Sequence, residues 1–143
     1  SQQLIEFLYH RARPFLFSTS HPPSVTATCQ AAFTLLASRA GAELIARLWE
    51  NTRYFQKGLV EQGFSPSGSE TPISPIPVGD AGKAYEFSRE LFKAGVFAPA
   101  VGYPTVAEGK ARLRAIVSAA HKREHLLKAA DTLAEVAKPL GIV

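Results

Sequence analysis

The stretch that decides the fold is Ala-Arg-Leu-Arg-Ala-Ile-Val-Ser, residues 111–118. Its positions alternate with the period of a β-strand, because successive side chains of a strand point to opposite faces of a sheet. One face carries Leu113, Ala115 and Val117, and the other carries Arg112, Arg114, Ile116 and Ser118. The alternation predicts a strand with one apolar face and one mixed face.

Other strands and helices are predicted on both sides of this strand. Residues 72–78 predict a second strand, which Pro75 and Pro77 restrict to the edge of a sheet. Residues 96–100 predict a short third strand. Apolar spacing predicts helices over about residues 42–62, 80–94 and 122–138. This order predicts an α+β fold (an α/β sandwich): a small, largely antiparallel sheet covered by helices on one side.

The opening of the chain is predicted to be helical and unusually apolar. A helix is expected over about residues 2–11, ended by Pro14 and followed by an apolar run at 15–17. Residues 23–38 are apolar or small on every side, which is typical of a buried helix and places Cys29 as a small buried hydrophobe. The small sheet cannot cover so much apolar surface. We expect these helices to pack against another part of a longer protein or against a partner chain.

Composition and charge exclude several classes of protein. The formal net charge is +4, but the cations are dispersed among 12 acidic residues, so we expect no nucleic-acid partner. Apolar runs are too short for a membrane span, and the first residues lack the apolar core of a signal peptide. One cysteine suits a reducing compartment. We expect a cytoplasmic protein without a membrane partner, and the chain, which contains no methionine, is expected to be a fragment.

Arg112 and Arg114 are the first candidates for binding chemistry. A guanidinium inside a core strand needs a partner, and the fork of an arginine can hold a carboxylate through two parallel hydrogen bonds. Both arginines could equally lie at the end of the strand and face water. The pattern alone favours the second interpretation.

A second candidate is the turn of residues 17–23, Phe-Ser-Thr-Ser-His-Pro-Pro, which precedes a helix. Hydroxyl groups at the N-terminus of a helix suit an anion such as phosphate, since backbone N–H groups and the helix dipole favour negative charge there. An ordinary Ser or Thr cap of the helix is the simpler explanation, and the pattern alone favours it.

His121 and His125 are four residues apart at the start of the last helix and could face one metal ion. Lys122 stands where a zinc protease would have Glu, and no third ligand is evident. We therefore expect no metal site, and His121 is interpreted as a capping or loop residue near a site.

Several segments, taken in order, resemble the α-oxoamine synthases, a branch of the fold-type I pyridoxal-phosphate enzymes related to class I and II aminotransferases. The segments are Arg-Pro-Phe-Leu-Phe-Ser-Thr-Ser-His-Pro-Pro at 13–23, Ser-Glu-Thr-Pro-Ile at 69–73, Tyr-Pro-Thr-Val at 103–106, Gly-Lys-Ala-Arg-Leu-Arg at 109–114 and Ser-Ala-Ala-His at 118–121. Their colinearity over nearly the whole chain is more specific than any single motif. The residues in these segments are most similar to the glycine C-acetyltransferase (2-amino-3-ketobutyrate CoA ligase) branch, with the 8-amino-7-oxononanoate synthase branch second.

The resemblance implies a fold, a cofactor and an oligomeric state. Residues 1–41 would be a segment of the large cofactor domain with interface helices, and residues 42–143 the C-terminal small domain of a homodimer. The cofactor would be pyridoxal 5'-phosphate, whose phosphate group Ser18 and Thr19 would contact across the subunit interface. Arg114 would hold the carboxylate of the amino acid substrate. The implied substrates are glycine and acetyl-CoA, or another acyl-CoA.

The chain departs from the family pattern in one important way. None of its seven lysines lies in the sequence context of the lysine that holds the cofactor, so no catalytic residue is assigned in this chain and the fragment alone is expected to be inactive. Two other functions stay open at this point. One is the C-terminal domain of a class I or II aminotransferase, and the other is a non-catalytic domain that uses this fold for dimerisation.

Overall fold

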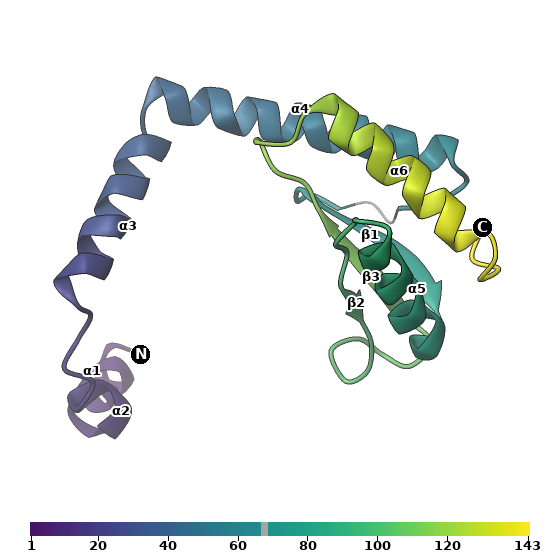
Figure 1. The fold of residues 1–143 in the computed structure, drawn as a ribbon. Coiled ribbons are helices and arrows are strands. Elements are labelled where there is room, and N and C mark those ends of the chain that lie inside the picture. Colours follow the sequence, from purple (N-terminus) through teal and green to yellow (C-terminus); the bar gives the residue numbers. More distant parts are fainter. Residues whose placement is uncertain (67–68) are drawn as a thin grey trace. The chain divides into compact units, whose positions relative to one another are not determined.

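The computed structural model describes residues 1–66 and 69–143 and divides them into two compact units, Ser1–Ala42 and Glu43–Val143 (Figure 1). Residues 65–71 are rich in Pro, Gly and Ser, which predicts a loop, and part of this loop lies outside the described residues. We describe each unit by itself. That the first 41 residues belong to a larger cofactor domain stays a prediction.

The first unit is helical. It contains α1 (Gln2–Arg11), α2 (Arg13–Leu16), α3 (Pro23–Leu36) and the first residues of α4 (Arg39–Glu61). The predicted apolar run at 15–17 is instead mostly the end of α2. The reason is Pro14, which lies in the first turn of α2, where its missing N–H costs no hydrogen bond.

The apolar surface of the first unit is exposed within this chain. No side chain of α1, α2 or α3 is buried, and Phe33 of α3 is 70% exposed. The prediction that α3 and Cys29 are buried is therefore wrong for the chain by itself. The physical reason is that the described residues of the first unit supply no surface that covers α3. Exposed apolar area of this kind is typical of an interaction surface.

The second unit contains a sheet of three antiparallel strands, β1 (Ile73–Gly79), β2 (Ala100–Val101) and β3 (Ala111–Ile116), in the order β1-β3-β2. Pro75 and Pro77 of β1 lie opposite Arg114 and Arg112 of β3. The N–H of Arg114 points to the other side of β3, where it donates to the carbonyl oxygen of Pro99 at 2.9 Å. Residues of a ladder alternate in the direction of their N–H groups, so the prolines occupy positions where no bond to β3 is lost. The predicted edge position of β1 is confirmed.

Helices cover one face of this sheet. They are the later part of α4, α5 (Ala81–Lys93) and α6 (Arg123–Ala137) (Figure 1). Their apolar side chains meet those of the sheet in one core. Leu113, Phe87 and Leu133 are fully buried at the centre of this core. The predicted fold, a small antiparallel sheet with helices on one side, is confirmed.

The third strand is shorter than predicted. Residues 96–100 were expected to form a short strand, but β2 contains only Ala100 and Val101. Pro99 is the reason: it accepts the bond from Arg114 but has no N–H to return, so the ladder cannot continue through this pair. After Arg114, no described residue of the segment 95–99 pairs with this edge of β3.

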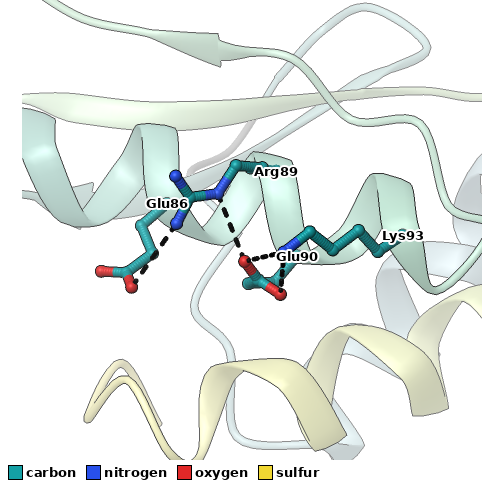
Figure 2. Close-up of polar contacts among 4 residues, drawn as sticks. All are labelled: Glu86, Arg89, Glu90 and Lys93. Carbon is teal, nitrogen blue, oxygen red and sulfur yellow. Dashed lines mark hydrogen bonds and ion pairs between the residues drawn. The ribbon is translucent and has the colours of Figure 1, made fainter.

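The outward surface of α5 carries a row of charges (Figure 2). Arg89 contacts Glu86 and Glu90, and Lys93 donates to both oxygens of Glu90 at 2.9 and 3.2 Å. The hydrogen bond from Lys93 and the one from Arg89 outweigh partial burial and hold the pKa of the Glu90 carboxyl below its ordinary value. These cations are paired on a solvated helix, which agrees with the interpretation of the net charge as surface charge.

Candidate functional site

Arg114 lies on the face of the sheet that no helix covers, and its side chain is exposed. Arg112 shares this face but is half-buried, and its Nε is enclosed without a hydrogen-bond partner among the described residues. From its position two residues further along the strand, we expected Arg114 to be less able to reach water than Arg112, and this expectation is wrong. The cause is the pairing of β2 with β3, which reaches Arg112 opposite Val101 and ends before Arg114.

A cleft of about 600 Å³ opens beside Arg114, along the free edge of β3. Its floor is apolar and includes Phe55 of α4, Val96, and Leu126 and Leu133 of α6. Several lining residues carry nitrogen in their side chains, and none of the described residues that line the cleft is acidic. They are Arg114, His121, His125 and Lys128. The cleft is suited to a ligand that combines an apolar part with a negative charge.

His121, which lines the cleft, ends a tight turn of residues 118–121 that follows β3. The N–H of His121 donates to the carbonyl oxygen of Ser118 at 3.2 Å, and the N–H of Ala120 donates to Ser118 Oγ at 3.2 Å. The imidazole folds back, and its Nδ1 accepts from the N–H of Ser118 at 3.1 Å. The interpretation of His121 as a loop-capping residue is thus supported by its contacts.

Asn51 of α4 holds this turn from the core side. Its amide nitrogen donates to the carbonyl oxygens of Ser118, at 3.0 Å, and His121, at 2.9 Å. Both partners are acceptors, so the group that meets them must be the amide NH₂, which has two donors. Asn51 is only 6% exposed. A buried amide whose two donors are both used fixes the position of the turn relative to α4.

Sequence reasoning missed Asn51. A signal was present: Asn51 lies between Leu48 and Phe55 on the apolar stripe of a predicted amphipathic helix. A polar amide on a buried helix face needs hydrogen-bond partners, so its position alone indicates a specific contact. The partners, 67 and 70 residues away, could not be named from the sequence.

The turn that contains Ser18 and Thr19 belongs to the first unit, and all three of its hydroxyl residues are exposed. Ser18 Oγ donates to the carbonyl oxygen of Phe15 at 2.9 Å and accepts from the N–H of Ser20 at 3.2 Å. Thr19 Oγ1 donates to the carbonyl oxygen of Ser18 at 2.7 Å. Thr19 and Ser20 have φ of 55° and 65°, in the left-handed region that non-glycine residues rarely adopt. Such strain is typical of functional turns.

The chemistry of this turn fits a phosphate group through hydroxyls rather than through the helix end. Pro22 caps α3 and Pro23 is its first residue, and neither has an N–H to offer. The N–H groups of Val25 and Thr26 already donate to the carbonyl oxygen of Pro22. The end of α3 therefore offers fewer free N–H groups to an anion than the sequence suggested. The exposed hydroxyls can rotate to an anion by giving up bonds to their own backbone.

The structure brings Arg114 and His121 together on one cleft, while Ser18 and Thr19 lie in the other unit. Over the described residues, no group of three or more His, Cys, Asp or Glu side chains is placed to hold a metal ion. Nδ1 of His125 instead faces the N–H of Lys122 at 3.4 Å at the start of α6. A search of the described helices finds none that is long and apolar enough to cross a bilayer.

Comparison with known proteins identifies the class to which this fold and site belong. The pattern of the class I and II aminotransferases matches residues 1–133. The chain belongs to this family of pyridoxal-phosphate enzymes. The expected cofactor is confirmed as that of the family, and a serine palmitoyltransferase from S. paucimobilis was solved with bound pyridoxal phosphate and myriocin.

Within the family, the relatives are α-oxoamine synthases. An 8-amino-7-oxononanoate synthase from Symbiobacterium thermophilum is 51% identical over 98% of this chain and 35% of the relative. 8-Amino-7-oxononanoate synthase 1 from Bacillus subtilis is 49% identical over 100% of this chain and 36% of the relative. A Thermus thermophilus relative, 48% identical over the same shares, is named both 8-amino-7-oxononanoate synthase and 2-amino-3-ketobutyrate coenzyme A ligase. The chain thus spans about a third of the length of the curated relatives it matches.

Solved structures agree with this placement. The S. paucimobilis serine palmitoyltransferase is 27% identical, with a TM-score of 0.81 over 92% of this chain and 33% of that chain. A Sphingomonas wittichii serine palmitoyltransferase is 26% identical, with a TM-score of 0.83 over 97% and 35%. Both support the assignment of the α-oxoamine synthase fold.

The expectation of a glycine C-acetyltransferase is wrong. The relatives that match the whole chain at 42–51% identity are named 8-amino-7-oxononanoate synthase, the branch that the sequence motifs placed second. The motifs quoted for the resemblance are shared by the whole family. They fix the cofactor class, and they do not fix the acyl group.

Proposed function

We propose that the chain is the C-terminal part of an 8-amino-7-oxononanoate synthase, a pyridoxal-phosphate-dependent acyltransferase. The observation that carries the proposal is the 51% identity to such a synthase along 98% of the chain. The similarity to the synthase runs along both units of the chain, which argues against a non-catalytic domain that serves only dimerisation. The cysteine content and the class of enzyme support a cytoplasmic location.

The product named for the relatives indicates the substrates by its carbon count. It has nine carbons, a ketone at C7 and an amino group at C8. An amino carbon with one attached methyl group is what alanine contributes after loss of its carboxyl group as CO₂. The remaining seven carbons correspond to an acyl thioester with a carboxylate at its far end, and the thiol leaves as the new carbon–carbon bond forms. We therefore propose alanine in place of the glycine expected from the sequence.

In this reaction the chain contributes binding and orientation. The cofactor, when bound, supplies the electron sink that makes the α carbon of the amino acid nucleophilic. Arg114 holds the amino acid carboxylate, because it lines the cleft, its side chain is exposed, and none of the described lining residues is acidic and could compete for it. Holding the carboxylate sets which bonds of the α carbon face the reacting groups.

Ser18 and Thr19 are proposed to hold the cofactor phosphate of a partner subunit in a homodimer. The exposed apolar surface of α1, α2 and α3 supports this assembly, since a surface of that kind needs cover in water. Exposed hydroxyls on a strained turn supply the hydrogen bonds. The two side chains would act from one subunit on a cofactor bound to the other.

A direct assay tests this function. The enzyme that contains this chain, loaded with pyridoxal phosphate, should release CO₂ and free thiol from alanine plus a seven-carbon, ω-carboxylated acyl thioester. The control is alanine plus a seven-carbon acyl thioester without the terminal carboxylate, which should react more slowly. Amino-group exchange with a 2-oxo acid and no thiol release would show an aminotransferase instead and would overturn the proposal.

A further inference from the structure

His121 presents a free hydrogen-bond donor on a ring that the fold holds still. Nδ1 accepts from the backbone N–H of Ser118, so in the neutral imidazole the proton lies on Nε2. Among the described residues Nε2 has no hydrogen-bond partner, and the side chain is half-buried in the wall of the cleft. The ring therefore has one nitrogen engaged by its own turn and the other available to a ligand.

The same cleft contains Arg114, four residues before Ser118 on the same strand and turn. A guanidinium can engage a carboxylate with two N–H groups, yet a carboxylate has about four lone-pair sites. A neutral donor beside the arginine adds a hydrogen bond without adding a second charge that must be desolvated. Nothing acidic among the described lining residues competes for that donor.

Asn51 fixes the orientation of His121 from behind. Its two donors meet the carbonyl oxygens at both ends of the turn, which sets where the backbone of Ser118 and His121 lies relative to α4. With the backbone fixed, the bond from the Ser118 N–H to Nδ1 selects both the ring rotamer and the tautomer. Three residues on two elements thus act as one unit.

We propose that His121 is a second substrate-binding residue, which donates from Nε2 to the amino acid carboxylate held by Arg114, and that Asn51 is its positioning residue. This inference rests on the proposed function, because it takes the carboxylate at Arg114 as its ligand. It assigns a substrate contact to the turn that follows β3 and a role in binding to a buried amide on α4.

Two substitutions separate binding from structure at His121. His121→Asn keeps an acceptor near the position of Nδ1 for the Ser118 N–H but removes the donor at Nε2. In the enzyme that contains this chain, His121→Asn should raise the KM for alanine about tenfold, the loss of one hydrogen bond to a charged group. The KM for the acyl thioester should stay unchanged. His121→Gln offers a distal donor without the turn acceptor and should recover part of the loss.

Asn51→Asp tests the positioning role, because it keeps the side-chain volume nearly constant and removes both hydrogen-bond donors. The new carboxylate places acceptor oxygens against the two carbonyl oxygens. It should raise the KM for alanine and abolish the single ring tautomer of His121, read from the ¹⁵N shifts of selectively labelled histidine. The control is Thr52→Ala, a buried neighbour on α4 whose hydroxyl donates to the carbonyl oxygen of Leu48. Thr52→Ala should lower stability and leave both readouts as they were.

The outcomes are distinguishable. An Nδ1–H tautomer in the unsubstituted enzyme would overturn the proposal whatever the variants do. If Arg114→Lys raises the KM for alanine while His121→Asn does not, the assignment of His121 is wrong and the proposed function stands. If neither variant affects alanine, the carboxylate site itself is misplaced.

Discussion

Pro75 lies directly opposite Arg114 in the sheet, and the N–H of Arg114 points away from it, to the carbonyl oxygen of Pro99 at 2.9 Å. Arg114 therefore stands between two prolines that cannot donate a backbone hydrogen bond to it. Its backbone position is set by the strand, while its side chain is exposed on the uncovered face. Substitution of the side chain should leave the fold intact, so functional effects at this position can be interpreted as binding.

The turn of Ser18 and Thr19 should be needed for cofactor retention. Replacement of both by Ala should weaken binding of pyridoxal phosphate, since each hydrogen bond to a charged phosphate contributes about 1.5–3 kcal/mol. Equilibrium dialysis of the enzyme measures the loss. Thr28→Val is the matched control, because the hydroxyl of Thr28 bonds to the carbonyl oxygen of Ser24 in its own helix. Unchanged retention in the double variant would refute the assignment.

The chain alone should not bind the cofactor covalently. Its lysines, which lie at 57, 83, 93, 110, 122, 128 and 138, are outside the sequence context of the cofactor lysine. Incubation with pyridoxal phosphate and reduction with borohydride should label no single lysine stoichiometrically, as read by peptide mass mapping. Specific labelling of one residue would contradict this expectation.

Gly58→Ala should stabilise the second unit. Gly58 lies inside α4, where glycine costs about 1 kcal/mol relative to alanine, and an added Cβ would meet Ala130 Cβ of α6 at 3.5 Å, an ordinary contact. Urea unfolding should show a gain of about 0.5–1 kcal/mol. Gly63→Ala is the control of opposite sign: Gly63 has φ of +91°, and alanine there should cost about 1 kcal/mol or more. Destabilisation by Gly58→Ala would mean that α4 and α6 lie closer than described.

Lys93→Met should raise the pKa of Glu90 toward its ordinary value, because the hydrogen bond from Lys93 is the largest cause of the lowering. A lowered pKa in the folded state contributes stability above the unfolded pKa, and that contribution is lost as pH falls through the folded pKa. Glu90 is only partly buried and Lys93 is exposed, so salt should reduce the effect. Carboxyl ¹³C titration measures the pKa, with Lys83→Met as the control. No change in Lys93→Met would show that the pair is absent in solution.

The sequence predicted the elements of the second unit well because their apolar periods agree with local stop signals. Gly63 follows α4 and Gly95 follows α5, and the prolines of β1 placed it at an edge. The prediction from sequence failed at β2, because Pro99 has no N–H to continue the ladder that the apolar residues before it suggested. The local sequence pattern does not show which residue pairs with Pro99. It therefore could not show where the ladder ends.

The candidate site was predictable in part. Arg114, Ser18 and Thr19 were found through the family resemblance, while alternation alone could not choose between Arg112 and Arg114. Their relative burial came out reversed because it depends on where β2 ends, a tertiary fact. Asn51 was missed because its partners are distant in sequence. Burial of α3 was predicted from composition, which cannot say whether the covering surface lies in this chain.

The steady-state KM for alanine in Arg114→Lys, compared with Arg112→Lys, tests the central claim most directly. Lysine keeps the charge but cannot reproduce the bidentate fork, so Arg114→Lys should raise this KM about tenfold or more, with cofactor absorbance and stability unchanged. Arg112→Lys should change it little. An increase in KM confined to Arg112→Lys would assign the carboxylate to Arg112 instead of Arg114. An unchanged KM in both variants would contradict the claim that this strand binds the substrate carboxylate.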